Sequence, residues 1–171
     1  MIKVNLNSFI FIIFCCSTPL LSAQNDNSQS HFTGLSLGYS YSFNGKGEPQ
    51  YHLLDVQLNK ALEGGRHGGG FIYGFGTEVV LNANRFTIGP KIGGFIFYNG
   101  LAIGSEFVTY TDFENWTFRY VFSIGLGSPK ARLTINPQVI LTNKNYRPIH
   151  KGFVNFTWNF ILDRKNETKT K

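Results

Sequence analysis

Six charged residues stand out because each lies on the small, polar side of a segment in which apolar and polar residues alternate. Three are acidic and three are basic, so the set is electrically balanced: Asp55, Glu78, Glu106, Lys91, Arg119 and Arg132. A buried charge without a partner is costly, so this balance fits side chains that share a buried space. Arg119 and Arg132 would then lie opposite Glu78 or Glu106.

Such a charge set has two interpretations. It could act as an ion-pair gate that blocks or passes small solutes, or its members could satisfy one another and make the surrounding structure rigid. We favour the second interpretation, because the interior of a narrow barrel is generally filled by side chains.

The four histidines are the residues to consider for acyl-transfer chemistry, in which a histidine activates a serine hydroxyl. They are His31, His52, His67 and His150. None of them has a serine two residues later, and His67 lies in the glycine-rich stretch "GGRHGGG". We therefore expect no enzyme activity, and His52 and His150 would be the first residues to mutate if acyl transfer were observed. The glycine-rich stretch is not followed by a helix that could bind phosphate, and no residues have the spacing of metal ligands. We expect no cofactor and no metal.

A third group of residues lies in the stretch "TNKNYRPIH", over residues 142–150. Lys144, Arg147 and His150 surround Tyr146 there, and a cluster of basic side chains attracts anions. This stretch is the candidate surface for an anionic partner such as the phosphate groups of lipopolysaccharide.

Eight alternating segments position these residues. In each segment every second side chain is apolar, as in a strand with one apolar face, and residues typical of turns separate the segments. The segments are 33–43, 53–62, 71–81, 85–98, 101–110, 116–126, 131–141 and 152–162. Asn99-Gly100 is the strongest hairpin signal. At Gly93-Gly94 the alternation falters, which predicts a bulge or a girdle at a membrane interface.

The identity of the two faces decides which face is inside. The polar face consists mainly of Gly, Ser, Thr, Asn and Gln, which suits the crowded lumen of a small barrel. The apolar face is dense in rings, including Tyr39, Tyr41, Phe43, Tyr73, Phe75, Trp116, Tyr120 and Trp158. A membrane barrel carries its apolar side chains outward, whereas a soluble lipocalin-like barrel carries them inward. The pattern therefore favours an all-β protein, an eight-stranded antiparallel up-and-down transmembrane β-barrel, over a sandwich or a soluble barrel.

The two ends of the chain differ from the segments between them. Residues 1–23 combine Lys3, an apolar run and a small-residue exit at Ala23, which is the layout of a secretory signal peptide. Both cysteines, Cys15 and Cys16, belong to this segment, so the mature chain has no disulfide. Residues 24–162 form the predicted barrel, and residues 163–171 form a polar, basic tail.

In these features the chain resembles the small eight-stranded outer-membrane barrels of the OmpA transmembrane-domain and OmpX type. The resemblance covers about residues 32 to 162 and includes the aromatic last segment "GFVNFTWNF". It implies the outer membrane of a Gram-negative-type bacterium, with both chain ends in the periplasm and lipid, lipopolysaccharide and the barrel-assembly machinery as partners. The basic tail follows the last aromatic residue, whereas the family usually ends on one. "EGGRHGGG" would also be a long periplasmic turn and "NAN" a short external loop, the reverse of the usual rule.

We therefore expect a monomeric barrel with a structural, envelope-integrity or surface-interaction role, and no nucleic-acid partner. The alternatives are a soluble periplasmic lipocalin-like binder of an apolar ligand, a narrow porin-like channel for small solutes, and a lipid A-modifying enzyme.

Overall fold

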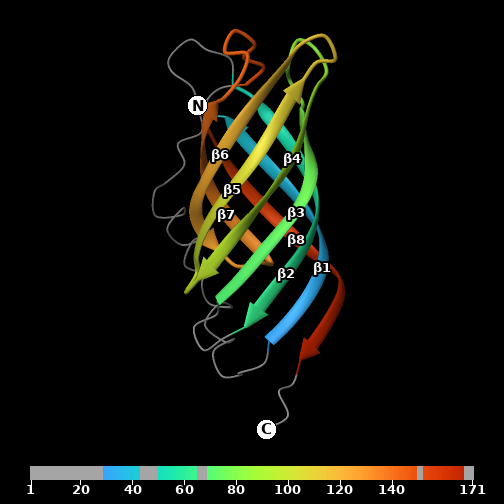
Figure 1. Cartoon of the computed structure of the whole chain (residues 1–171), viewed down its shortest axis with the longest axis vertical. Helices are drawn as coiled ribbons and strands as arrows, with labels where there is room; N and C mark the ends of the chain where they lie inside the picture. Colours follow the sequence, from blue (N-terminus) through green and yellow to red (C-terminus); the bar gives the residue numbers. More distant parts are fainter. Residues whose placement is uncertain (1–28, 43–49, 65–68, 150–151, 168–171) are drawn as a thin grey trace, which may run out of the picture.

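The computed structural model describes residues 29–42, 50–64, 69–149 and 152–167, which form one closed, all-antiparallel barrel (Figure 1). Each strand pairs with the next in the sequence, and the last pairs with the first. The strands are β1 (Gln29–Ser42), β2 (His52–Gly64), β3 (Gly69–Val80), β4 (Thr87–Tyr98), β5 (Leu101–Thr111), β6 (Trp116–Gly127), β7 (Ala131–Ile140) and β8 (Gly152–Glu167). The predicted up-and-down barrel of eight strands is confirmed. The predicted signal peptide, Phe43, His67 and His150 lie outside the described residues.

The side chains alternate across the wall as the sequence predicts. In β6, Thr117, Arg119 and Ser123 are buried in the lumen, whereas Trp116 and Phe122 are exposed on the outside. The same alternation holds along most of the other strands and along β8 as far as Asn159, because successive residues of a strand point to opposite faces. The polar face lines the lumen and the apolar face covers the outside.

Glycines on the lumenal side allow neighbouring strands to approach closely. A Cβ atom on Gly125 would lie 2.0 Å from the carbonyl oxygen of Leu133, and one on Gly74 would lie 2.2 Å from that of Leu58. Neither position has room for a side chain. The wall of a narrow barrel must curve strongly, and residues without a Cβ make that curvature possible.

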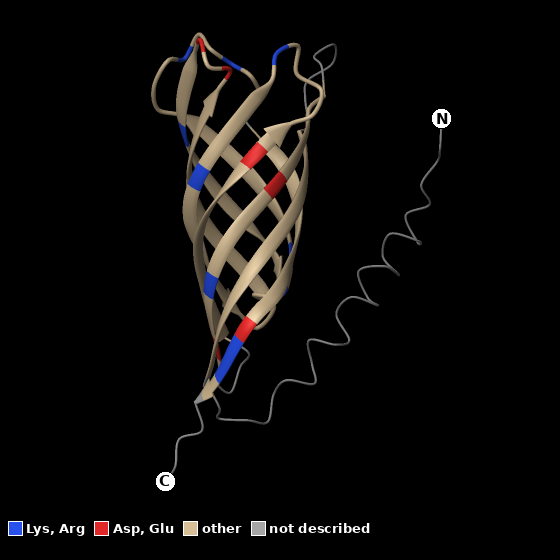
Figure 2. Cartoon of the chain, turned by 90° about the vertical axis from the view of Figure 1, so that its right-hand side faces the viewer, with Lys and Arg blue, Asp and Glu red and all other residues tan. Residues whose placement is uncertain are grey.

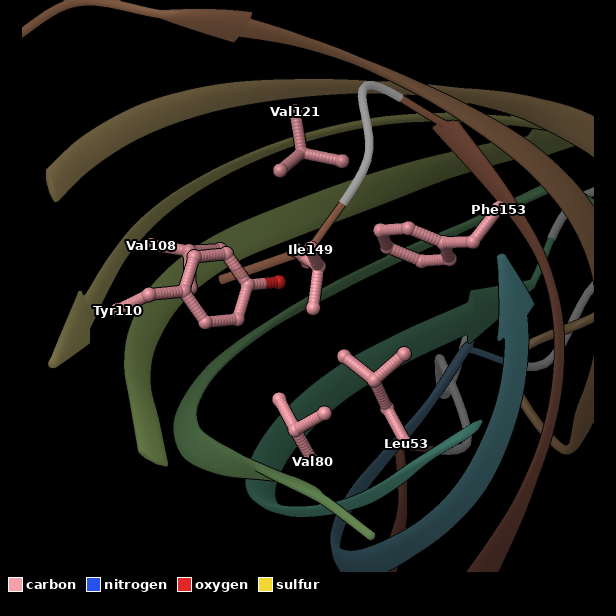
Figure 3. Close-up of a cluster of buried hydrophobic side chains, with 7 residues drawn as sticks. All are labelled: Leu53, Val80, Val108, Tyr110, Val121, Ile149 and Phe153. Atoms are coloured by element: carbon pink, nitrogen blue, oxygen red, sulfur yellow. The ribbon is translucent and has the colours of Figure 1, made fainter. Parts of the chain in front are cut away.

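Two clusters of buried apolar side chains close the lumen, one near each end. The first contains Leu53, Val80, Val108, Tyr110, Val121, Ile149 and Phe153, and Figure 3 shows Ile149 from the β7–β8 connection among the strand residues. The second contains Phe32, Ala61, Ile72, Phe95, Phe97 and Ala102. The sequence predicts a polar lumen, and the structure adds an apolar layer at each end of it.

The second cluster explains the irregular alternation near Gly93-Gly94. The pairing of β4 with β3 and β5 runs through these residues without a shift, so the predicted bulge is wrong. Phe95 and Phe97 point inward and belong to the apolar cluster, while Ile96 and Tyr98 point outward. Both faces of β4 are apolar here, which removes the alternation from the sequence without disturbing the strand.

The connections differ in length between the two ends of the barrel. Those at the end that carries the C-terminal end of β8 span residues 65–68, 99–100 and 128–130. The connections at the opposite end span residues 43–51, 81–86, 112–115 and 141–151. The strands extend further into "EGGRHGGG" than predicted, so that turn is shorter than the connection at "NAN", and the expected reversal of loop lengths does not occur.

β8 continues to Glu167, into the segment predicted as a polar tail. Its pairing with β1 shifts between Thr33 and Gly34, where Leu162 is an extra residue without a partner in β1. Beyond this bulge Arg164 forms an ion pair with Glu63 of β2 at 2.7 Å and donates a hydrogen bond to the Ser30 hydroxyl at 3.1 Å. The bulge therefore keeps β8 paired while the alternation of its residues changes phase.

Candidate functional site

The charged residues of the lumen gather around one lysine. Lys91 Nζ donates hydrogen bonds to Asp55 Oδ2 and Glu78 Oε1, both at 2.9 Å, and lies 3.5 Å from Glu106 Oε1. None of the four side chains is more than 5% exposed. We call these four residues the Lys91 cluster. One ammonium group thus faces three carboxylates that come from the strands on either side of it.

The strand register explains this arrangement. Asp55 and Glu78 are direct cross-strand partners on the lumenal face, where two carboxylates would repel each other. The long side chain of Lys91 reaches both of them because its own partner in β3 is Gly76, which leaves room beside it. Glu106 is likewise paired with a glycine, Gly93. A glycine opposite each long side chain is the local feature that lets the cluster form.

Neutral and aromatic groups extend the Lys91 cluster across the lumen. Gln57 Nε2 donates a hydrogen bond to Glu106 Oε1 at 2.7 Å, and the Tyr110 hydroxyl donates one to Glu78 Oε2 at 2.5 Å. The guanidinium of Arg119 lies 5.2 Å from the centre of the Tyr110 ring. The hydrogen bonds and the ring contact connect the acidic side of the lumen with the strand that carries Arg119.

The two arginines do not form the salt bridges that the sequence suggests. Arg119 donates hydrogen bonds to Gln138 Oε1 at 2.9 Å and to the Ile149 carbonyl at 3.1 Å, which fixes the β7–β8 connection in the mouth of the barrel. The Arg132 guanidinium lies over the Phe95 ring, 4.2 Å from its centre, and interacts electrostatically with Glu106 and Asp55. Lys91 takes the place nearest the carboxylates because its flexible side chain reaches the middle of the lumen, and the arginines lie nearer the two apolar clusters.

The lumenal face of β1 forms neutral hydrogen-bonded pairs with its two neighbours, β2 and β8. Asn59 Nδ2 donates to the Ser36 hydroxyl at 2.5 Å, and Asn155 Nδ2 donates to the Ser40 hydroxyl at 2.8 Å. Buried polar groups are stable when they have such partners. Together with the charged residues they fill the middle layer of the lumen between the two apolar clusters.

Tyr110 and Phe95 lie next to the charged side chains of the lumen, and the sequence analysis did not identify these two aromatic residues as part of the site. Each lies on the lumenal face of its strand, where the alternation predicts a small or polar residue. An aromatic residue at such a position can be recognised in the sequence as an exception to the alternation. It indicates a specific contact, because a ring inside a narrow barrel must pack against a particular neighbour. Here each ring has an arginine against it.

The other predicted residues are not brought together in the same way. His52 Nδ1 forms a hydrogen bond with the Tyr39 hydroxyl on the outer face, and its ring lies against that of Tyr41. Pairing places His52 opposite Tyr41 and His31 opposite Leu62, so the two histidines lie at opposite ends of β1 and do not share a site.

The predicted anion-binding stretch lies in the β7–β8 connection. Lys144 and Arg147 are exposed, and Arg147 Nε donates a hydrogen bond to the Lys144 carbonyl at 3.0 Å. Tyr146 between them is only partly exposed, and burial raises the pKa of its hydroxyl. The two cations therefore lie on one ordered turn at the mouth of the barrel.

The outside of the barrel is an apolar surface. Every strand contributes large exposed apolar side chains, among them Leu37, Val56, Phe75, Ile92, Phe107, Ile124, Ile135 and Trp158. Figure 2 shows charged residues at both ends of the barrel and fewer along the strands between them. Lys60 on β2 is exposed, whereas six other charged residues within the strands are buried: Asp55, Glu78, Lys91, Glu106, Arg119 and Arg132. No helix long and apolar enough to cross a membrane occurs in the part of the chain that the structure describes.

No three His, Cys, Asp or Glu side chains are grouped so that they could hold a metal ion within residues 29–42, 50–64, 69–149 and 152–167. The three carboxylates of the Lys91 cluster have the lysine itself as their cation. No family model, curated protein or solved structure matches the chain.

Proposed function

We propose that the protein is an integral β-barrel of the outer membrane, with a structural role in the envelope and with loops that contact anionic surface molecules. The observation that carries the proposal is the apolar wall, to which all eight strands contribute. Soluble proteins rarely expose continuous apolar areas of more than a few hundred Å². A wall of this kind around the whole barrel is typical of a surface that lipid covers.

The same wall argues against a soluble lipocalin-like binder. Such a barrel binds an apolar ligand inside and presents polar side chains to water. In this protein the middle layer of the lumen contains charged and amide side chains, and both apolar layers are buried side-chain packing. The arrangement is the reverse of the one that a lipocalin needs.

The lumen also argues against a channel. A solute would have to displace Ile149 and its neighbours at one end, separate the Lys91 cluster, and then displace Phe95 and Phe97 at the other. Each step opens well-packed or ion-paired groups. We therefore propose that the charge set makes the barrel rigid, and that the protein is neither a pore nor an enzyme.

The length of the connections supports an orientation. Outer-membrane barrels have short periplasmic turns and longer external loops. The longer connections here lie at the end that carries Lys144 and Arg147, so these cations would face the lipopolysaccharide phosphates outside. The short turns and the C-terminal end of β8 would face the periplasm and the barrel-assembly machinery.

Membrane fractionation tests the proposal. We expect the protein to stay in the outer-membrane fraction after washing with carbonate and with urea, because lipid covers its apolar wall. Release into the soluble fraction, or a monodisperse protein without detergent that binds an apolar ligand, would refute it. Stable ohmic conductance in planar bilayers would overturn the closed lumen while leaving the membrane location intact.

A further inference from the structure

The last part of β8 extends beyond its neighbour β7. β7 begins at Ala131, which pairs with Trp158, and the turn before it reaches only as far as Asn159, whose N–H donates to the Lys130 carbonyl at 2.7 Å. Residues 160–167 of β8 continue to pair with β1 on one side. On the other side, no strand among the described residues pairs with them. We call this free side of residues 160–167 the β8 edge.

Side-chain exposure supports this picture independently. From Gly152 to Asn159 buried or half-buried residues recur along β8, as in a closed wall. From Phe160 to Asn166 every side chain is exposed, including Leu162 at 63%. β8 here projects past the lumen as a strand held by β1, and within the described part of the chain no strand pairs with the backbone donors and acceptors of its second edge. Such an edge is a template for another strand.

We propose that the β8 edge binds an extended acidic segment of another protein, which adds a strand to the sheet. Backbone hydrogen bonds would supply the affinity, as in other cases of strand addition, and the side chains would select the partner. Lys165 is exposed within this part of β8, exposed Lys130 lies beside its start, and the sequence continues with Lys169 and Lys171. Together with Arg164 these cations outnumber the two anions of the stretch, Asp163 and Glu167, so its net charge is positive. An acidic strand complements these charges.

A second copy of the chain does not fit the β8 edge. Two copies would bring like-charged lysines together, and lysines on an edge strand oppose self-association. Antiparallel pairing through this edge would also point the two barrels in opposite directions. This second argument rests on the proposed function, since two copies in one membrane share their orientation. The proposed function also places the edge in the periplasm.

Peptide binding to the full-length protein in detergent micelles tests the inference. The probe is a peptide of alternating valine and glutamate, long enough to cover residues 160–167, and binding is followed by isothermal titration calorimetry. We expect saturable binding that is lost when the peptide amides facing β8 are N-methylated, because methylation removes the ladder donors. Lys130→Glu with Lys165→Glu should weaken binding by about tenfold, since two exposed charge attractions become repulsions. The matched control is a peptide of the same length with alternating valine and lysine, which should bind the wild-type protein at least about tenfold more weakly.

Three results would overturn the inference: no saturable binding, equal binding of the N-methylated peptide, or a dimer in sedimentation that forms through β8 without peptide. Equal binding of the N-methylated peptide would mean attraction by charge alone. These results are independent of the proposed function. A protein that carbonate washing releases, yet that binds the peptide as expected, would overturn only the membrane location.

Discussion

Replacing Lys91 by methionine removes a cation that lies within 3.5 Å of all three carboxylates. Methionine keeps the length and the apolar stem of the side chain, so the packing changes little. Asp55, Glu78 and Glu106 would then share a buried space without their ammonium partner. Removing one member of a buried ion pair typically costs about 3–5 kcal/mol, and three remaining carboxylates place Lys91→Met at the upper end of that range. A loss of this size is a large fraction of the stability of an ordinary domain.

Urea unfolding in detergent micelles, followed by tryptophan fluorescence, measures this loss. The matched control is Lys60→Met, which removes an exposed lysine of β2 and should change the free energy of unfolding by no more than about 0.5 kcal/mol. If Lys91→Met does not fold, the variants Asp55→Asn and Glu78→Gln test the same contacts.

The triple variant Lys91→Met, Asp55→Asn, Glu78→Gln is the decisive comparison. Because it removes charges of both signs, it should be more stable than the sum of its parts predicts, with a coupling of about 1–3 kcal/mol. Simple additivity, or a Lys91→Met protein within about 1 kcal/mol of wild type, would refute the reasoning, since either result would mean that the charges do not depend on one another.

Three further predictions concern the end of the barrel that carries the longer connections. Ile149→Ala should lower the free energy of unfolding by about 2–5 kcal/mol, because Ile149 is buried in the cluster that closes the mouth, and an unchanged urea midpoint would contradict this packing. Hydrogen bonds from the backbone N–H groups of Asn115 and Glu114 hold the pKa of Asp112 below its ordinary value of 3.8. The order that Asp112 gives its loop should therefore be complete above that value and be lost as the pH falls through the lower folded-state pKa. Hydrogen exchange of the Asn115 amide measures this, and Asp112→Asn should exchange faster even at neutral pH. Lys144→Glu with Arg147→Glu should weaken binding to lipopolysaccharide vesicles and reduce its salt dependence, and equal binding would exclude this turn as the anion site.

The fold could be predicted because most of the wall has a strict two-residue period. β6 and β7 keep the same alternation almost from end to end, and the strand bounds follow from it within a few residues. The alternation fails where both faces are apolar, as at Phe95 and Phe97. It also fails at Leu162, where the bulge changes the phase, so the pattern of β8 stops there although the strand continues to Glu167.

The members of the charged site could be predicted, but their pairing could not. An inward position follows from the local sequence, whereas a contact depends on the register of neighbouring strands and on side-chain reach. The glycines Gly76 and Gly93 opposite Lys91 and Glu106 decide which charges meet, and only the register reveals them. The inward positions of Tyr110 and Phe95 follow from the alternation, but their contacts with the two arginines depend on the register.

The Lys91 cluster has a consequence for the order in which the barrel assembles. Its four residues lie on consecutive strands, β2 to β5, within residues 55–106. Contacts between elements that are close in the sequence require the closure of only short loops, so they form early at little entropic cost. A sheet of these four strands can therefore complete the ion pairs before β8 meets β1. The pull of three carboxylates on one central ammonium would curl this sheet toward its polar side, and an open intermediate would already carry the curvature that brings its two edges together.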